Sequence, residues 1–97
     1  MRVTFEPAAR NELDGIFAWI AKDSPRAAHE MIARIEVKVM RLETLELAHM
    51  GRPGLVEGTR ELLEYPYVIV YKVFEEQDEI VVLSVVHGAQ DREGELV

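Results

Sequence analysis

The chain has 97 residues, 48% of them hydrophobic, which predicts a single domain over residues 1–97 with one modest core. The absence of cysteine excludes disulfides and thiol chemistry, and no apolar run approaches the roughly 18 residues that span a bilayer, so we expect a cytoplasmic protein without a membrane partner. Residues 57–97 carry the whole net charge of −7, which makes direct nucleic-acid binding unlikely because phosphate contacts need clustered lysine and arginine.

The N-terminal half predicts one strand followed by two helices. Residues 2–6 alternate between apolar and polar side chains, as a half-buried strand does. Pro7 suits the first position of a helix, and an apolar stripe at helical spacing follows it. Gly15 interrupts this stripe and predicts close approach by another element. Ser24 can cap and Pro25 can open a second helix, so the two helices should form an antiparallel hairpin.

The C-terminal half predicts a loop and three strands. Residues 47–58 contain three glycines and a proline and are typical of a loop. Strand-like segments follow at residues 60–65, 67–74 and 79–87, separated by Pro66 and by a polar turn. The order of elements predicts an α+β fold, in which an N-terminal strand joins a four-stranded, mainly antiparallel sheet and the helical hairpin packs on one face.

His87 is the first candidate functional residue, because it ends a long apolar strand and is followed by Gly88. We expect it at the rim of the sheet, within reach of Arg60 or Tyr71, in a partner-binding or structural role. A metal site would require His87 to converge with His29 and His49. Nothing in the pattern demands that convergence, and no metal or cofactor is expected.

Three aromatic residues allow two interpretations each. Trp19 lies beside the stripe of the first helix, where packing between the helices is the preferred interpretation and partner contact the alternative. Tyr67 and Tyr71 are four residues apart in one strand and therefore share a face. They either pack against the helices or form an aromatic surface for a partner.

The sequence resembles the RelE/ParE toxin superfamily of bacterial toxin–antitoxin systems. Four stretches carry the resemblance, in the order of the superfamily and over nearly the whole chain: AARNELDGIFAWIAKDSPRAA, GRPG, RELLEYPYVIVYKV and VLSVVHGAQD. The phrase His87-Gly88-Ala89, followed by Asp91, is most similar to the ParE or plasmid-stabilisation branch.

The resemblance implies one of two activities. RelE-like members cut messenger RNA on the ribosome, whereas ParE-like members poison DNA gyrase without cutting. The RelE-like pattern has an arginine where this chain has Val68 and a basic residue where it has Ala89-Gln90. Arg60 and His87 remain as catalytic candidates if the protein is a nuclease. The prediction therefore favours a gyrase-binding toxin that is not an enzyme.

The resemblance also implies a cognate antitoxin with a ribbon-helix-helix head and a tail that wraps the toxin. Two alternatives stay open: a ribosome-dependent endoribonuclease, and an attenuated homologue that binds only the antitoxin. The predicted partner-binding residues are Phe17, Trp19, Arg60, Tyr67, Tyr71, His87, Gln90, Asp91 and Arg92.

Overall fold

The computed structural model describes residues 1–44 and 48–88 of the chain. In these residues it contains two α-helices, one 3-10 turn and five strands. They follow one another as β1 (Arg2–Phe5), α1 (Pro7–Ala21), α2 (Pro25–Met40), η1 (Arg41–Glu43), β2 (Arg52–Pro53), β3 (Arg60–Glu64), β4 (Tyr67–Phe74) and β5 (Glu79–His87).

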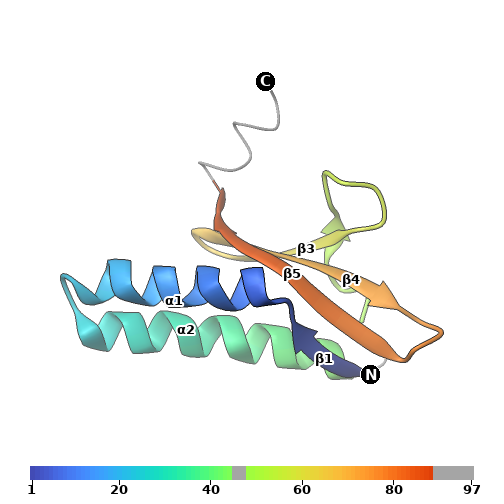
Figure 1. The fold of residues 1–97 in the computed structure, drawn as a ribbon, viewed down its shortest axis with the longest axis horizontal. Coiled ribbons are helices and arrows are strands. Elements are labelled where there is room, and N and C mark those ends of the chain that lie inside the picture. Colours follow the sequence, from blue (N-terminus) through green and yellow to red (C-terminus); the bar gives the residue numbers. More distant parts are fainter. Residues whose placement is uncertain (45–47, 89–97) are drawn as a thin grey trace.

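The strands form one sheet in the order β1-β5-β4-β3-β2, and the helical hairpin covers one of its faces (Figure 1). β3, β4 and β5 form the predicted antiparallel meander, whereas β1 pairs with β5 in parallel. The predicted α+β fold is confirmed, with one strand more than the four predicted. The additional strand, β2, has two residues and ends in Pro53, which is tolerated because β2 lies at the sheet edge.

Both helices begin where the sequence predicts. Pro7 opens α1, and Ser24 caps α2 by accepting a hydrogen bond from the Ala27 N–H at 3.1 Å, directly before Pro25. The helices have 15 and 16 residues. Among the residues that the structure describes, no helix is long and apolar enough to cross a membrane.

The core lies between the hairpin and the sheet. On β4 it includes Ile69, and on β5 it includes the alternating residues Ile80 and Val82. The buried cluster consists of Ala9, Leu13, Met31, Ile35, Val39, Leu42, Ala48, Leu62, Tyr67, Ile69, Tyr71, Ile80, Val82 and Val85.

Gly51 lies just before β2, close to Glu61 of β3 and Tyr71 of β4. Its N–H donates to the hydroxyl oxygen of Tyr71 at 2.9 Å. A Cβ at this position would lie 2.6 Å from the carbonyl oxygen of Glu61 and 2.8 Å from the Tyr71 hydroxyl. The close approach of these atoms requires glycine.

Gly51→Ala is therefore expected to destabilise the protein by about 1–3 kcal/mol, the usual cost of overpacking a core. Gly15→Ala is the matched control. A Cβ at Gly15 would meet nothing within 4 Å, and alanine is the better helix former by about 1 kcal/mol. Urea denaturation followed by far-UV circular dichroism should show opposite shifts for the two variants. Equal free energies of unfolding would contradict the packing argument.

Candidate functional site

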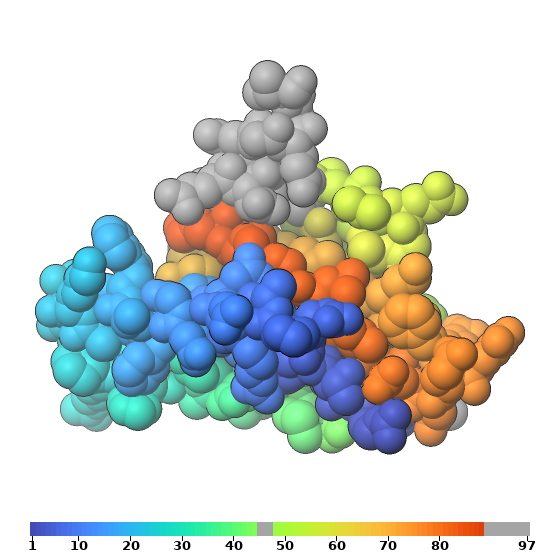
Figure 2. Space-filling model, in the orientation of Figure 1, coloured from blue at the N-terminus to red at the C-terminus, as the bar shows by residue number. Residues whose placement is uncertain are grey.

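A groove of about 620 Å³ runs between α1 and the C-terminal half of β5. Figure 2 shows α1, in blue, lying directly against β5, in orange and red. A volume of this size is typical of sites that bury a small ligand or several side chains of a partner. The lining residues are Glu12, Gly15, Ile16, Trp19, Tyr67, Val85, Val86 and His87.

Gly15 and Trp19 shape the α1 wall of this groove. The prediction that Gly15 allows close approach by another element is wrong, because its missing side chain leaves open space within the groove. The preferred prediction for Trp19, packing between the helices, is also wrong, since the residue is 69% exposed. The Lys22 ammonium lies 5.2 Å from the indole centroid, within cation–π range. An exposed indole beside an open groove is the kind of side chain that dominates protein interfaces.

The edge of β5 that faces away from β4 is flanked first by β1 and then, along the groove, by α1. β1 accompanies β5 only as far as the pairing of Phe5 with Val82. Beyond it α1 takes over: the Glu12 carboxylate accepts hydrogen bonds from the Ser84 hydroxyl at 3.0 and 3.2 Å and from the Val85 N–H at 3.2 Å. Within the described residues no second strand flanks this last part of β5. It is therefore a sheet edge, and Glu12 covers part of it.

Glu12→Ala is expected to destabilise the protein by about 1–2 kcal/mol, because it removes charge-assisted hydrogen bonds to Ser84 and Val85. Hydrogen exchange of the Val85 amide should accelerate. Asp14→Ala, an exposed carboxylate on the same helix, should change stability by less than about 0.5 kcal/mol. Unchanged protection of the Val85 amide in Glu12→Ala would show that the carboxylate does not hold this edge.

His87 ends β5 at the groove and is held by β4. It pairs with Tyr67, and the two rings meet edge to face with centroids 5.7 Å apart and an interplanar angle of 82°. The Gly88 N–H then donates to the carbonyl oxygen of Pro66 at 2.9 Å, so the chain stays attached to the β3–β4 turn. These contacts fix the imidazole in the wall of the groove.

Arg60 lies at the start of β3 and contacts the loop before β2. Its guanidinium donates to the carbonyl oxygen of His49 at 3.0 Å and to that of Gly51. These two hydrogen bonds tie the loop to the sheet. A guanidinium used in this way is a structural support for the loop.

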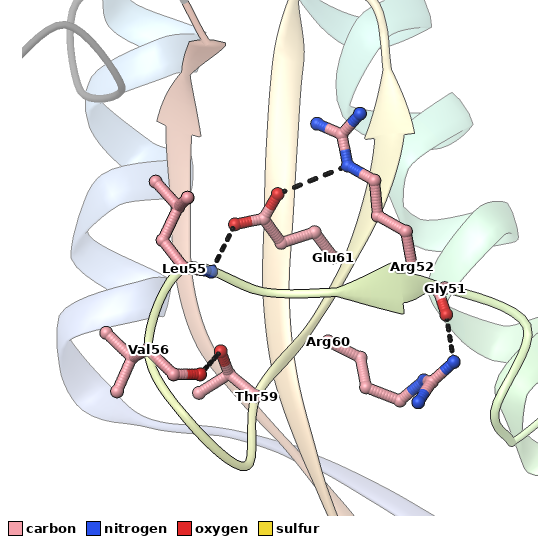
Figure 3. A network of polar contacts seen from close by, with 7 residues as sticks. All are labelled: Gly51, Arg52, Leu55, Val56, Thr59, Arg60 and Glu61. Carbon is pink, nitrogen blue, oxygen red and sulfur yellow. Dashed lines mark hydrogen bonds and ion pairs between the residues drawn. The ribbon is translucent and has the colours of Figure 1, made fainter. Parts of the chain in front are cut away.

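Glu61 leaves β3 in the opposite direction to Arg60, as Figure 3 shows. Its carboxylate is nearly buried at 4% exposure and accepts hydrogen bonds from Arg52 Nε and from the Leu55 N–H, each at 3.4 Å. The carboxylate thereby positions the loop between β2 and β3. Adjacent residues of β3 thus support two different loops.

The structure separates the two nuclease candidates. Arg60 pairs with Tyr71, and His87 pairs with Tyr67. The prediction that His87 lies within reach of Arg60 or Tyr71 is wrong, because four residues of β4 correspond to about 13 Å along the strand. Groups that transfer protons in one reaction act within about 3 Å of the atoms concerned. Arg60 and His87 therefore do not form one catalytic site here.

The remaining predicted residues have different positions. Phe17 is half-buried, and its ring meets His29 edge to face at 4.9 Å. Tyr71 is fully buried, so its ring belongs to the core and not to an exposed aromatic surface. In residues 1–44 and 48–88, no three His, Cys, Asp or Glu side chains gather as a metal site. The predicted contacts Gln90, Asp91 and Arg92 lie outside the described residues.

A family model and a curated relative each match most of the chain. A family model described as "ParE toxin of type II toxin-antitoxin system, parDE" matches residues 3–92. A curated protein of Sinorhizobium fredii named "Putative toxin Y4kP" is 37% identical over 91 residues, covering 92% of this chain and 90% of that protein.

Solved structures show the same fold. A chain of the chromosomal ParDE system of P. aeruginosa has a TM-score of 0.77 at 27% identity, covering 90% of this chain and 95% of that one. A chain of the RelBE2 toxin–antitoxin complex of Mycobacterium tuberculosis has a TM-score of 0.62 at 26% identity, covering 89% and 95%. Because the family model spans nearly the whole chain, this protein belongs to the ParE toxin family of type II toxin–antitoxin systems.

Proposed function

We propose that this toxin acts by binding DNA gyrase, without cleaving RNA, and that a cognate antitoxin neutralises it. The observation that carries the proposal is the separation of Arg60 from His87 along β4. Val68, at the arginine position of the RelE-like pattern, is an aliphatic residue with only 2% exposure. Loss of one charge-stabilising donor costs about 10²–10³ in rate. A site that lacks this arginine, and in which Arg60 and His87 lie apart, is a poor nuclease. This favours action through protein binding.

The α1–β5 groove suits the antitoxin. Extended peptides bind by adding to a sheet edge, and β5 has such an edge beyond Val82. Trp19 offers an exposed aromatic contact beside it, and the Glu12 carboxylate favours a lysine or arginine in the bound segment. The ParDE and RelBE2 relatives are themselves toxin–antitoxin systems, which supports a partner of this kind. Both proposed partners act in the cytoplasm, so the proposal places the toxin there.

Induced expression in bacterial cells tests the proposal, with growth, gyrase-dependent DNA breaks and messenger RNA integrity measured together. We expect growth arrest with DNA breaks, intact A-site codons on programmed ribosomes, and recovery when the neighbouring antitoxin gene is co-expressed. A ribbon-helix-helix product of that gene would fit the expected head.

Two results would overturn the proposal. Codon cleavage that disappears in Arg60→Ala and His87→Ala would establish a nuclease. Antitoxin binding without growth arrest or DNA breaks would establish an attenuated homologue that has lost its target.

A further inference from the structure

Two adjacent aliphatic residues, Leu55 and Val56, stand exposed at the bend of the loop between β2 and β3. Leu55 is 47% exposed and Val56 is 63% exposed, and we call this pair the loop tip. The loop, drawn in yellow-green, projects from the sheet on the side away from the helical hairpin (Figure 1). Aliphatic surface left in water forgoes the stabilisation that burial would give. The packing of the fold therefore does not explain why both residues of the tip are apolar.

Hydrogen bonds fix the backbone that carries the loop tip. The Thr59 N–H donates to the carbonyl oxygen of Val56 at 3.1 Å, and the Thr59 hydroxyl donates to the same oxygen. The Gly54 N–H donates to the carbonyl oxygen of Thr59 at 2.8 Å, which closes the base of the loop. On the other side, the Leu55 N–H donates to the Glu61 carboxylate (Figure 3). The tip is thus held from both sides.

The turn after the tip also favours one conformation. The hydrogen bond from Thr59 to Val56 closes a four-residue turn, and its third residue, Gly58, has a φ of +86°. A positive φ at this position is what a type II turn requires, and glycine adopts it without strain. A loop whose backbone is already fixed loses little conformational entropy when it binds. Pre-organisation of this kind favours a binding role for the tip.

The charges beside the tip largely cancel. Arg52 forms an ion pair of 3.4 Å with the nearly buried Glu61, and Arg60 leaves β3 in the opposite direction. Glu57 is exposed in the turn, and the Lys72 side chain reaches the same turn from β4. The tip therefore offers a partner apolar contact more than net charge.

We propose that the loop tip anchors the toxin on its target by entering an apolar pocket of DNA gyrase. This inference rests on the proposed function and adds the residues that make the contact. In the sheet, β3 and β4 lie between β2 and β5, and no residue of the loop lines the α1–β5 groove. The target contact and the proposed antitoxin contact thus lie on different parts of the toxin.

Two other occupants fit the tip less well. A stable dimer buries about 800 Å² on each partner, and two aliphatic side chains supply only a small part of that area. An anionic membrane attracts basic surfaces, whereas this chain has a net charge of −7 and the tip has no basic excess. A pocket in a larger interface needs no such area from the tip, because a few buried side chains can dominate binding.

The test measures binding of the full chain to purified DNA gyrase by isothermal titration. The double tip variant Leu55→Ser, Val56→Ser should bind at least about ten-fold more weakly, because the pocket loses both aliphatic contacts. The apolar double variant Leu55→Ile, Val56→Ile should stay within about three-fold of the natural chain. Because both residues are exposed, the urea midpoint of each variant should match that of the natural chain.

A matched control removes two apolar side chains of similar exposure elsewhere. Val37→Ser, Met40→Ser changes residues of α2 that are 64% and 53% exposed, and it should alter gyrase affinity by less than about two-fold. Antitoxin binding is the second readout. The double tip variant should bind the cognate antitoxin within about two-fold of the natural chain, and it should lose growth arrest and gyrase-dependent DNA breaks in cells.

The outcomes distinguish this inference from the proposed function. If the natural chain binds gyrase and the double tip variant binds equally well, the tip is not the contact, while the proposed function stands. If the natural chain does not bind gyrase, both are overturned. Equal losses in the tip variant and the α2 control would show that exposed apolar residues act without specificity.

Three further results would assign the tip to another occupant and overturn the inference. A loss of antitoxin affinity as large as the loss of gyrase affinity would assign it to the antitoxin. Self-association of the natural chain that disappears in the double tip variant would assign it to a second copy. Binding to phosphatidylglycerol vesicles that disappears in the same variant would assign it to a membrane surface.

Discussion

Replacing Tyr71 by alanine is expected to remove about 3–5 kcal/mol of stability, the usual cost of truncating a buried aromatic side chain. Tyr71 is fully buried in β4, and its hydroxyl accepts the hydrogen bond from the Gly51 N–H. Domains of this size have about 5–15 kcal/mol in total, so the substitution removes a substantial share of the free energy of unfolding. Urea denaturation followed by circular dichroism measures the loss.

Two phenylalanine variants separate the ring from its hydroxyl. Tyr71→Phe keeps the packing but leaves the Gly51 N–H without its acceptor, at an expected cost of about 1–3 kcal/mol. Tyr65→Phe is the matched control, because Tyr65 is 80% exposed and should change stability by less than about 0.5 kcal/mol. If Tyr71→Phe were as stable as the control, the hydroxyl would have no structural role.

Local signals in the sequence were enough to predict most of the fold. Pro7, Ser24 and Pro25 mark helix starts through backbone chemistry that acts within a few residues. The last two strands have the predicted bounds, because their short length, their many β-branched residues and the flanking turns together favour strands over helices. β2 was not predicted, since its two residues form a strand only through pairing with β3. Such pairing depends on contacts that no local pattern reports.

The candidate site was less predictable because it depends on register. His87 was correctly placed at a strand end, but its neighbour follows from the pairing of β4 with β5. Glu12 was not singled out, although it is a carboxylate beside the apolar stripe of α1. The local signal for Glu12 was its position one turn before Ile16 of the apolar stripe, close to Gly15, a residue type that weakens a helix. Its role follows from the end of β1 at Phe5, opposite Val82 of β5.

Filling the groove is expected to weaken antitoxin binding at least about 100-fold without unfolding the toxin. Gly15→Leu places an isobutyl group in the open space of the α1 wall, and leucine is also a better helix former than glycine. The variant should therefore be at least as stable as the natural chain. A 100-fold change in Kd corresponds to about 2.7 kcal/mol, which is within the range of a steric block at an interface centre.

Trp19→Ala should weaken the same complex about 30-fold or more, because exposed tryptophans at interfaces commonly contribute about 2 kcal/mol or more. Ala18→Leu is the control on the same helix: Ala18 is exposed and does not line the groove, so affinity should stay within about two-fold. Isothermal titration with the cognate antitoxin measures all three variants. Full affinity in both Gly15→Leu and Trp19→Ala would place the antitoxin elsewhere on the toxin. It would also leave the β5 edge beyond Val82 without its proposed occupant, because Gly15 and Trp19 line the groove beside that edge.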